Sequence, residues 1–215
     1  MKFYSLGEEI ANSISHGIGA LFGIVALVIM CVTCAFTDAD IYQIVAVIIY
    51  GISLILLYTS STLYHALTNK TAKKVFRILD HASIYLLIAG SYTPFTLVTL
   101  RECNNIGWII FILIWILAIA GVVFSAVCIN KFKSLNAIVY VIMGWLIVFC
   151  LPQLVEIFQN TNSMNALYLL IAGGVTYTLG VIFYALKFKY SHFIWHLFVL
   201  GGSIFHFIAV LLYVL

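Results

Sequence analysis

The chain has 215 residues, of which 65% are hydrophobic and only 8% are charged. Soluble domains carry roughly a quarter charged residues, and the mean hydropathy here is +1.18. This composition excludes an ordinary water-soluble domain and predicts an all-α polytopic membrane protein. The formal net charge of +3 is small, and no segment is typical of a nucleic-acid-binding module, so no nucleic-acid partner is expected.

The apolar residues form runs long enough to cross a bilayer, since a membrane-spanning helix needs about 20 residues. Seven such runs lie at residues 14–36, 42–67, 79–99, 107–128, 136–157, 165–186 and 192–214. The connections between them are short. The sequence therefore predicts one domain over residues 1–215, a seven-transmembrane-helix bundle in the cell membrane. The first run is too long for a signal-peptide core and no A-x-A-like site follows it, so we expect it to be retained.

The charged loop residues predict an orientation in the membrane. Alternate loops hold eight of the ten basic residues, namely Lys70, Lys73, Lys74, Arg77, Lys131, Lys133, Lys187 and Lys189. The other loops contain Asp38, Asp40, Arg101 and Glu102, or no basic residue. Short loops rich in Lys and Arg remain cytoplasmic. We therefore expect the N-terminus inside and the C-terminus outside.

The first predicted span carries few polar groups. Glu8 and Glu9 precede it and are either a solvated helix start or part of a site, and His16 at its cytoplasmic start is expected to have a structural or supporting role. Cys31 and Cys34 form C-x-x-C in the outer part of this helix. Because no βαβ unit surrounds them, we interpret them as small packing residues and not as a redox or metal pair.

Three later spans bring ionisable residues to one depth near the cytoplasmic face. The second span ends in "SSTLYH", with Ser61 and His65 one helical turn apart, and the seventh begins "SHFIWH", with the same spacing between His192 and His196. The third span begins "LDHASIYLL", in which Asp80 is followed by His81. Unpaired ionisable groups are costly in hydrocarbon, so such residues usually face one another, a cavity or an ion.

These residues predict a zinc site. His65, His192 and His196 would supply three nitrogen ligands to Zn²⁺, which in catalytic sites keeps a fourth position for water. The residues between the paired histidines provide no general base, so Asp80 is the candidate for that role. His81 is assigned a structural or supporting role. The alternative is that the histidines are packing residues or hydrogen-bond to lipid headgroups, and the pattern itself leaves both open.

A second group of polar residues extends from this depth into the membrane. His206 is ten residues beyond His196, about 15 Å deeper, and cannot share the same ion. It joins a polar line that comprises Asp80, Ser83, Ser91 and the Pro94 kink on the third span, and Ser203 on the seventh. This line either borders a pocket that extends toward the outer leaflet or forms a hydrogen-bonded packing contact.

The chain resembles the hemolysin III family, the bacterial branch of the progestin and adipoQ receptor superfamily. The resemblance is carried by "EEIANSISHGIG", "SSTLYH", "LDHASIYLLIAGSYTPF" and "HFIWHLFVLGGSIFHF". It implies a seven-helix fold with zinc near the cytoplasmic face, held by His65, His192 and His196. It also implies that Asp80 takes the role of the aspartate that holds a zinc-bound water, and that Ser61 is the serine of the same site.

The leading hypothesis is a zinc-dependent hydrolase that acts on an amide or ester of a membrane lipid, with Asp80 and Ser61 as catalytic residues and the acyl chain in the pocket. The alternative is a non-enzymatic membrane regulator or receptor-like protein in which zinc joins the helices. A cytolytic pore is disfavoured because secreted pore-formers are water-soluble before insertion. Ion transport is disfavoured because no chain of ionisable groups crosses the bilayer.

Overall fold

The computed structural model describes residues 4–128 and 133–215, and this part of the chain consists of helices joined by short turns and irregular segments. The unbroken spans are α1 (Leu6–Phe36), α2 (Ile41–Ala66), α3 (Lys70–Pro94) continued by the π-helical η1 (Phe95–Thr99), α4 (Ile106–Cys128), α7 (Met164–Ala185) and α8 (Ser191–Tyr213). The remaining span comprises α5 (Lys133–Gly144), the 3-10 segment η2 (Leu146–Cys150) and α6 (Leu151–Asn160). Seven helical segments are long and apolar enough to cross a membrane, which confirms the predicted fold class.

Side-chain caps extend two helices beyond their apolar runs. α1 begins at Leu6 and not near residue 14, because Ser5 Oγ accepts a hydrogen bond from Glu8 N while Glu8 Oε2 accepts one from Ser5 N. α3 begins at Lys70 because Asn69 Oδ1 accepts from two backbone amides of its first turn, each at 3.0 Å. Such caps satisfy amides that have no partner within the helix. The helices thus extend past the predicted spans at the end of the bundle where the basic loops lie.

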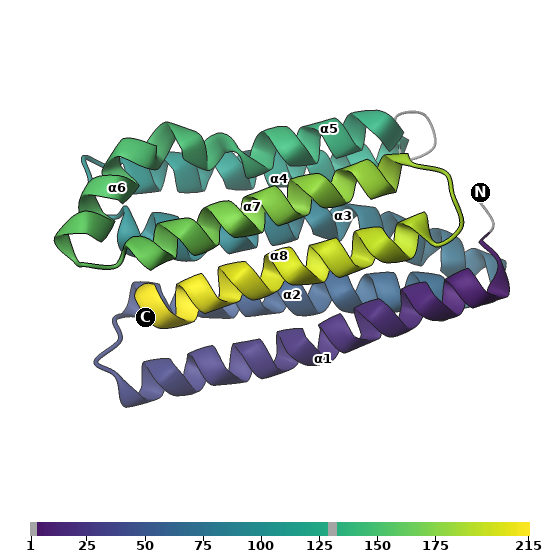
Figure 1. Cartoon of the computed structure of the whole chain (residues 1–215), viewed down its shortest axis with the longest axis horizontal. Coiled ribbons are helices and arrows are strands. Elements are labelled where there is room, and N and C mark those ends of the chain that lie inside the picture. Colours follow the sequence, from purple (N-terminus) through teal and green to yellow (C-terminus); the bar gives the residue numbers. More distant parts are fainter. Residues whose placement is uncertain (1–3, 129–132) are drawn as a thin grey trace.

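The helices lie side by side along the long axis of the molecule, with the N- and C-termini at opposite ends (Figure 1). α1 packs against α2 and α8, α2 packs against α3, and α7 packs against α8. Within its most apolar stretch, α3 has 72% of its residues buried, compared with 28% for α1 and α4. The polar residues of α3 therefore face protein and not lipid.

The fifth span is interrupted where the sequence predicted one continuous helix over residues 136–157. α5 ends at Gly144, and the Tyr92 hydroxyl from α3 accepts a hydrogen bond from Ile147 N at 2.8 Å. The same hydroxyl lies 2.9 Å from the carbonyl oxygens of Met143 and Gly144, to which it donates. Backbone groups inside a bilayer need a partner within the protein, and Tyr92 provides one at this break.

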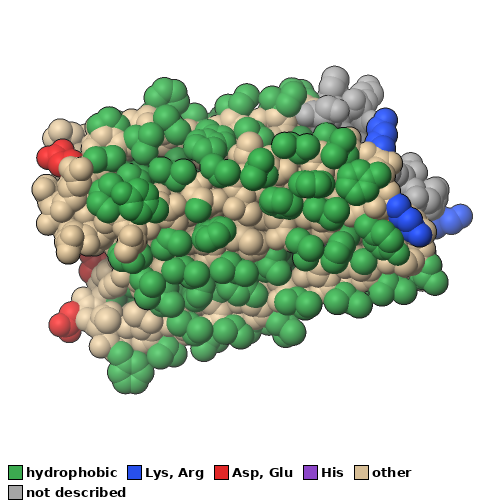
Figure 2. Space-filling view, viewed as in Figure 1, with side chains coloured by type: hydrophobic (Ala, Val, Ile, Leu, Met, Phe, Trp, Pro, Cys, Tyr) green, Lys and Arg blue, Asp and Glu red, His purple; other side chains and the backbone are tan. Residues whose placement is uncertain are grey.

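The outer surface is apolar along the length of the bundle and charged at its ends. In the view of Figure 2, green side chains cover the sides, while Lys and Arg lie at one end and Asp and Glu at the other. Large exposed residues such as Ile18, Val25 and Ile116 are each more than half accessible. A surface of this kind is suited to lipid, which confirms a multi-pass membrane protein. Lys131, one of the predicted loop cations, lies outside the described residues.

The C-x-x-C pair does not form a disulfide. Cys31 and Cys34 are both free, as are Cys103 and Cys150 among the described residues. Cys34 is buried in the apolar core with Ala26 and Met30. This position agrees with the interpretation of Cys31 and Cys34 as small packing residues.

Candidate metal centre

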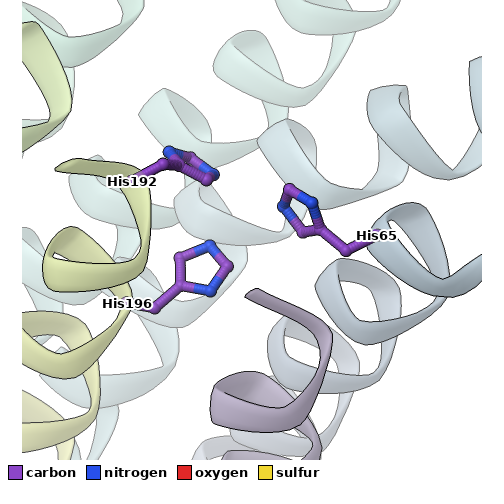
Figure 3. Close-up of side chains that lie close together, drawn as sticks. All are labelled: His65, His192 and His196. Carbon is purple, nitrogen blue, oxygen red and sulfur yellow. The ribbon is translucent and has the colours of Figure 1, made fainter. Parts of the chain in front are cut away.

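Three predicted histidines meet at one end of the bundle. His65 comes from the last turn of α2, whereas His192 and His196 come from the first turns of α8, and all three rings point toward one another (Figure 3). Their candidate ligand atoms lie within 4.8 Å of one another. His65 and His196 are buried and His192 is half-buried. Three imidazoles at this spacing are a set of donors that can hold one metal ion.

The two buried rings each have a nitrogen that could bind a metal ion. His65 Nδ1 lies 2.6 Å from Glu9 Oε2, so we assign the proton to Nδ1, and Nε2 is buried without a hydrogen-bond partner among the described residues. His196 Nδ1 lies 3.1 Å from the Asn12 carbonyl oxygen, which can only accept. Nε2 of each ring therefore carries the lone pair that zinc requires. Metal-bound histidines usually donate the other N–H to a carboxylate or carbonyl group, as both do here.

The groups that orient these rings come from one face of α1. Glu9, Asn12 and His16 follow the i, i+3, i+7 spacing of a single helix face. Glu9 accepts from His65 Nδ1, the Asn12 carbonyl oxygen accepts from His196 Nδ1, and His16 stacks on His196 with ring centres 3.5 Å apart. Lys73 Nζ donates to Glu9 Oε1 at 2.8 Å and balances its charge.

The two glutamates make different contacts. Glu9 contacts His65 of the cluster, whereas Glu8 caps α1 and accepts a hydrogen bond from Tyr190 N at 3.1 Å. Asn12 was not predicted as a site residue. The periodic spacing of Glu9, Asn12 and His16 in an otherwise apolar helix was the available indication.

Asp80 lies beside the histidines without joining them. It is 8% exposed, and its Oδ2 is 3.5 Å from His81 Nδ1. Its carboxylate is not part of the group of atoms that lie within 4.8 Å of one another. Ser61, one turn before His65 on α2, is fully buried, and its Oγ has no hydrogen-bond partner among the described residues. This arrangement leaves the carboxylate available for contact with a ligand.

Two further residues border the centre. His81 Nδ1 also contacts the Arg77 carbonyl oxygen at 3.0 Å, and the backbone carbonyl of His81 accepts a hydrogen bond from the Tyr140 hydroxyl at 2.9 Å. Tyr4, which was not predicted, stacks on His192 with ring centres 5.2 Å apart. Burial raises the pKa of the Tyr4 phenol, so this ring remains neutral. An aromatic residue ahead of the first helix gives no indication in the sequence that it covers a site.

A cavity connects the histidine cluster to the interior of the bundle. It has an empty volume of about 980 Å³ including its opening, and its lining includes His192 and His196 at one end and His206 at the other. Asp80 and Ser91 also line it, as the predicted pocket required. Ser83 and Ser203, which also belong to the predicted polar line, form hydrogen bonds within the protein and do not line this cavity. The Ser83 hydroxyl donates to the Asp80 carbonyl oxygen, and Ser203 Oγ bonds the hydroxyls of Tyr58 and Tyr177.

α3 ends at Pro94, where the predicted kink is a change to the π-helical η1.

Comparison with known proteins identifies the family. Residues 4–207 match the family described as Haemolysin-III related. The chain is similar to Hemolysin-3 of Bacillus cereus, with 46% identity over 97% of this chain and 92% of that protein. It is also similar to the Hemolysin-3 homolog of Bacillus subtilis, with 42% identity over 98% and 96% of the two chains. The human Monocyte to macrophage differentiation factor is 29% identical over 94% of this chain and 83% of its own length. The protein is therefore an integral membrane member of the Haemolysin-III related family.

Proposed function

We propose that the protein is a zinc-dependent hydrolase that cleaves an amide or ester bond of a membrane lipid. The observation that carries the proposal is a group of three imidazoles with a buried carboxylate beside it, at one end of a cavity bordered mainly by apolar side chains. Three protein ligands with one open position are typical of catalytic zinc, whereas structural sites usually have four. Bound Zn²⁺ supplies Lewis-acid chemistry: it polarises a carbonyl group and acidifies water.

The chain's own residues would divide the remaining work. His65, His192 and His196 hold the ion, and Glu9 fixes the orientation of the His65 ring. Asp80 accepts a proton from the attacking water and returns it to the leaving group, as general acid–base catalysis requires. Its burial next to the cavity places the carboxylate where bulk water does not compete. Ser61 Oγ, close to Asp80, would hold the carboxylate in position.

The cavity supports a lipid substrate. Apolar and aromatic groups such as Leu87, Ile88 and Val199 border most of it. An acyl chain would occupy the apolar part while its carbonyl group lies at the histidine cluster. The surrounding helices would exclude water from the bound acyl chain. A membrane protein can receive such a substrate from the bilayer without exposing it to solvent.

The second candidate function is a membrane regulator in which zinc joins helices. It is favoured by the way the cluster and its supports connect α1 and α2 with α8, which is distant from both in sequence. In that case Asp80 would be a ligand, or would serve only to balance charge. The two functions differ in what the loss of the Asp80 carboxylate does.

The test compares Asp80→Asn with His196→Ala in full-length protein purified in detergent. Under the hydrolase proposal, Asp80→Asn keeps stoichiometric zinc and a nearly unchanged melting temperature, because three histidines still hold the ion. It nevertheless loses the lipid change that the wild type causes in cell membranes, because an amide is not a base near neutral pH. His196→Ala loses zinc and the lipid change together. Equal zinc loss in both variants would reject the hydrolase and favour the regulator.

A further inference from the structure

The far end of the cavity contains a second polar group, remote from the metal centre. His206 lies ten residues beyond His196 on α8, about 15 Å farther along the helix. It lines the main cavity and a deeper one of about 670 Å³ that continues between Phe95, Leu154 and Leu170. The deeper cavity is bordered almost entirely by apolar side chains. His206 therefore marks a polar point partway along an otherwise apolar path.

The state of the His206 ring is defined by its neighbours. Nε2 lies 3.2 Å from the Leu170 carbonyl oxygen, which can only accept, so we assign the proton to Nε2. Nδ1 is then a hydrogen-bond acceptor, and it is buried without a partner among the described residues. A buried acceptor that has no partner is unfavourable, so a donor on a ligand would be favoured at this point.

The ring is also held in one orientation. A Cβ added at Gly173 would collide with Cδ2 and Nε2 of His206, so this edge of the ring packs directly against the backbone of α7. Tyr177 packs edge-on at a ring-centre distance of 5.5 Å, and its hydroxyl is occupied by Ser203. Nδ1 lies on the opposite side of the ring, turned away from α7. The acceptor is thus fixed in direction before any ligand enters.

Other hydroxyl groups along this stretch are already engaged. The Thr178 hydroxyl donates to the Gly174 carbonyl oxygen and accepts from Trp145 Nε1 at 2.9 Å. The Ser91 hydroxyl donates to the Ile88 carbonyl oxygen. Both residues line the main cavity and keep acceptor lone pairs, but each is already hydrogen-bonded, whereas Nδ1 of His206 has no hydrogen bond among the described residues. His206 is accordingly the group on which a ligand donor satisfies an atom that otherwise has no partner.

We infer that the cavity selects acyl chains carrying a mid-chain hydroxyl group, which donates a hydrogen bond to Nδ1 of His206. The polar head of the lipid lies at the histidine cluster, the hydroxyl lies about 15 Å away, and the remaining tail enters the deeper apolar cavity. This inference rests on the proposed lipid-hydrolase function for the placement of the head group, and it specifies the class of chain that is bound. A chain without the hydroxyl leaves Nδ1 unpaired.

The test measures equilibrium binding of free fatty acids to the full-length protein in detergent, so that no turnover is needed. The probes are stearate, stearate with a hydroxyl on its twelfth carbon, and stearate with a hydroxyl next to the carboxyl group. Wild type should bind the mid-chain hydroxy acid about two- to tenfold more tightly than stearate, the range given by one net hydrogen bond. The hydroxyl next to the carboxyl group should give no such gain.

Variants then assign the preference to His206. His206→Phe keeps a ring of similar size and should bind all three acids alike, whereas His206→Gln retains an acceptor and should keep part of the preference. Thr178→Val removes a hydroxyl that is already engaged and should leave the preference intact. Loss of preference in Thr178→Val with retention in His206→Phe would overturn the inference.

The ligand comparison in wild type does not depend on the folding of any variant. Equal binding of stearate and its mid-chain hydroxy form by wild type overturns the inference and leaves the hydrolase proposal standing. Binding of neither acid removes the cavity as an acyl site and overturns the inference as well. A clear preference in a protein whose Asp80→Asn variant loses its zinc would reject the hydrolase but retain the selective cavity.

Discussion

At the scale of single residues, the contact between Glu9 and His65 connects the start of the chain to the candidate metal centre. The carboxylate lies 2.6 Å from His65 Nδ1 and also accepts from Lys73 Nζ at 2.8 Å. A carboxylate in this position fixes the proton on Nδ1 and makes Nε2 a better ligand. Lys73 makes a buried negative charge tolerable near the membrane. We therefore expect Glu9 to be a positioning residue and not a ligand.

We expect Glu9→Gln to lower zinc affinity about 10- to 100-fold, the usual effect of losing such a partner. An amide still bonds the ring but no longer fixes its tautomer by charge. Chelator competition followed by metal analysis measures the change. The adjacent Glu8→Gln is the matched control, since Glu8 contacts Ser5 and Tyr190 and should leave affinity unchanged. Equal affinities for Glu9→Gln and the control would contradict the positioning role.

The residue scale also shows what the sequence predicts about the site. The i, i+4 spacing of His192 and His196, and their depth shared with His65, led to the prediction of a shared metal site, with packing residues as the alternative. Tyr4 and Asn12 were not predicted, because their role depends on how α1 is rotated against α2 and α8. A glutamate near a helix start, such as Glu9, is favourable both when it is exposed to water and when it contacts another side chain. No local sequence pattern distinguishes these two situations.

At the scale of secondary-structure elements, the fifth span differs most from its sequence-based description. Hydropathy measures the transfer of side chains and is insensitive to whether each backbone amide keeps its helical partner. The run over residues 136–157 therefore reads as one helix, although Gly144 and Pro152 lie within it. The break is stable because Tyr92 on a different helix satisfies the freed groups. A contact between helices cannot be read from the broken segment alone.

We expect Tyr92→Phe to lower the melting temperature of the purified protein. The substitution leaves the Ile147 amide and two carbonyl groups at the break without their hydroxyl partner, at a cost of about 1–3 kcal/mol. Tyr168→Phe is the matched control, because Tyr168 is 61% exposed on α7. Thermal unfolding of both variants in one detergent measures the difference. A melting temperature for Tyr92→Phe equal to that of the control would show that water or another group satisfies the break.

At the scale of the whole molecule, Lys and Arg side chains lie at one end of the bundle in Figure 2 and acidic side chains lie at the other, where Asp40 pairs with Arg101 at 2.6 Å. The overall fold was predictable because a chain in lipid has few ways to satisfy its backbone, and apolar runs of sufficient length become helices. The packing order of those helices was not predictable from hydropathy. It arises from close contacts such as that of α1 with both α2 and α8.

We expect the N-terminus to be cytoplasmic and the C-terminus external. Fusions at Leu215 to a reporter active only outside the cell should give signal, and fusions to a reporter active only inside should not. Fusions between α7 and α8, near Lys187, should give the reverse pattern, because positive loops remain inside. A cytoplasmic signal at Leu215 would invert the topology and place the metal centre near the outer face.

Because α1 and α2 pack with α8, the site can be assembled only in a fixed order during synthesis. Glu9, Asn12 and His65 are synthesised early, so Glu9 can already orient the His65 ring while the chain is still growing. His192 and His196 emerge only with the last helix, which must enter beside α1 and α7. A chain cut short before Ser191 has only one of the three clustered histidines, so under the proposed function it would not retain zinc. Metal loading would then follow complete synthesis and insertion, and bound zinc would distinguish complete molecules from truncated ones.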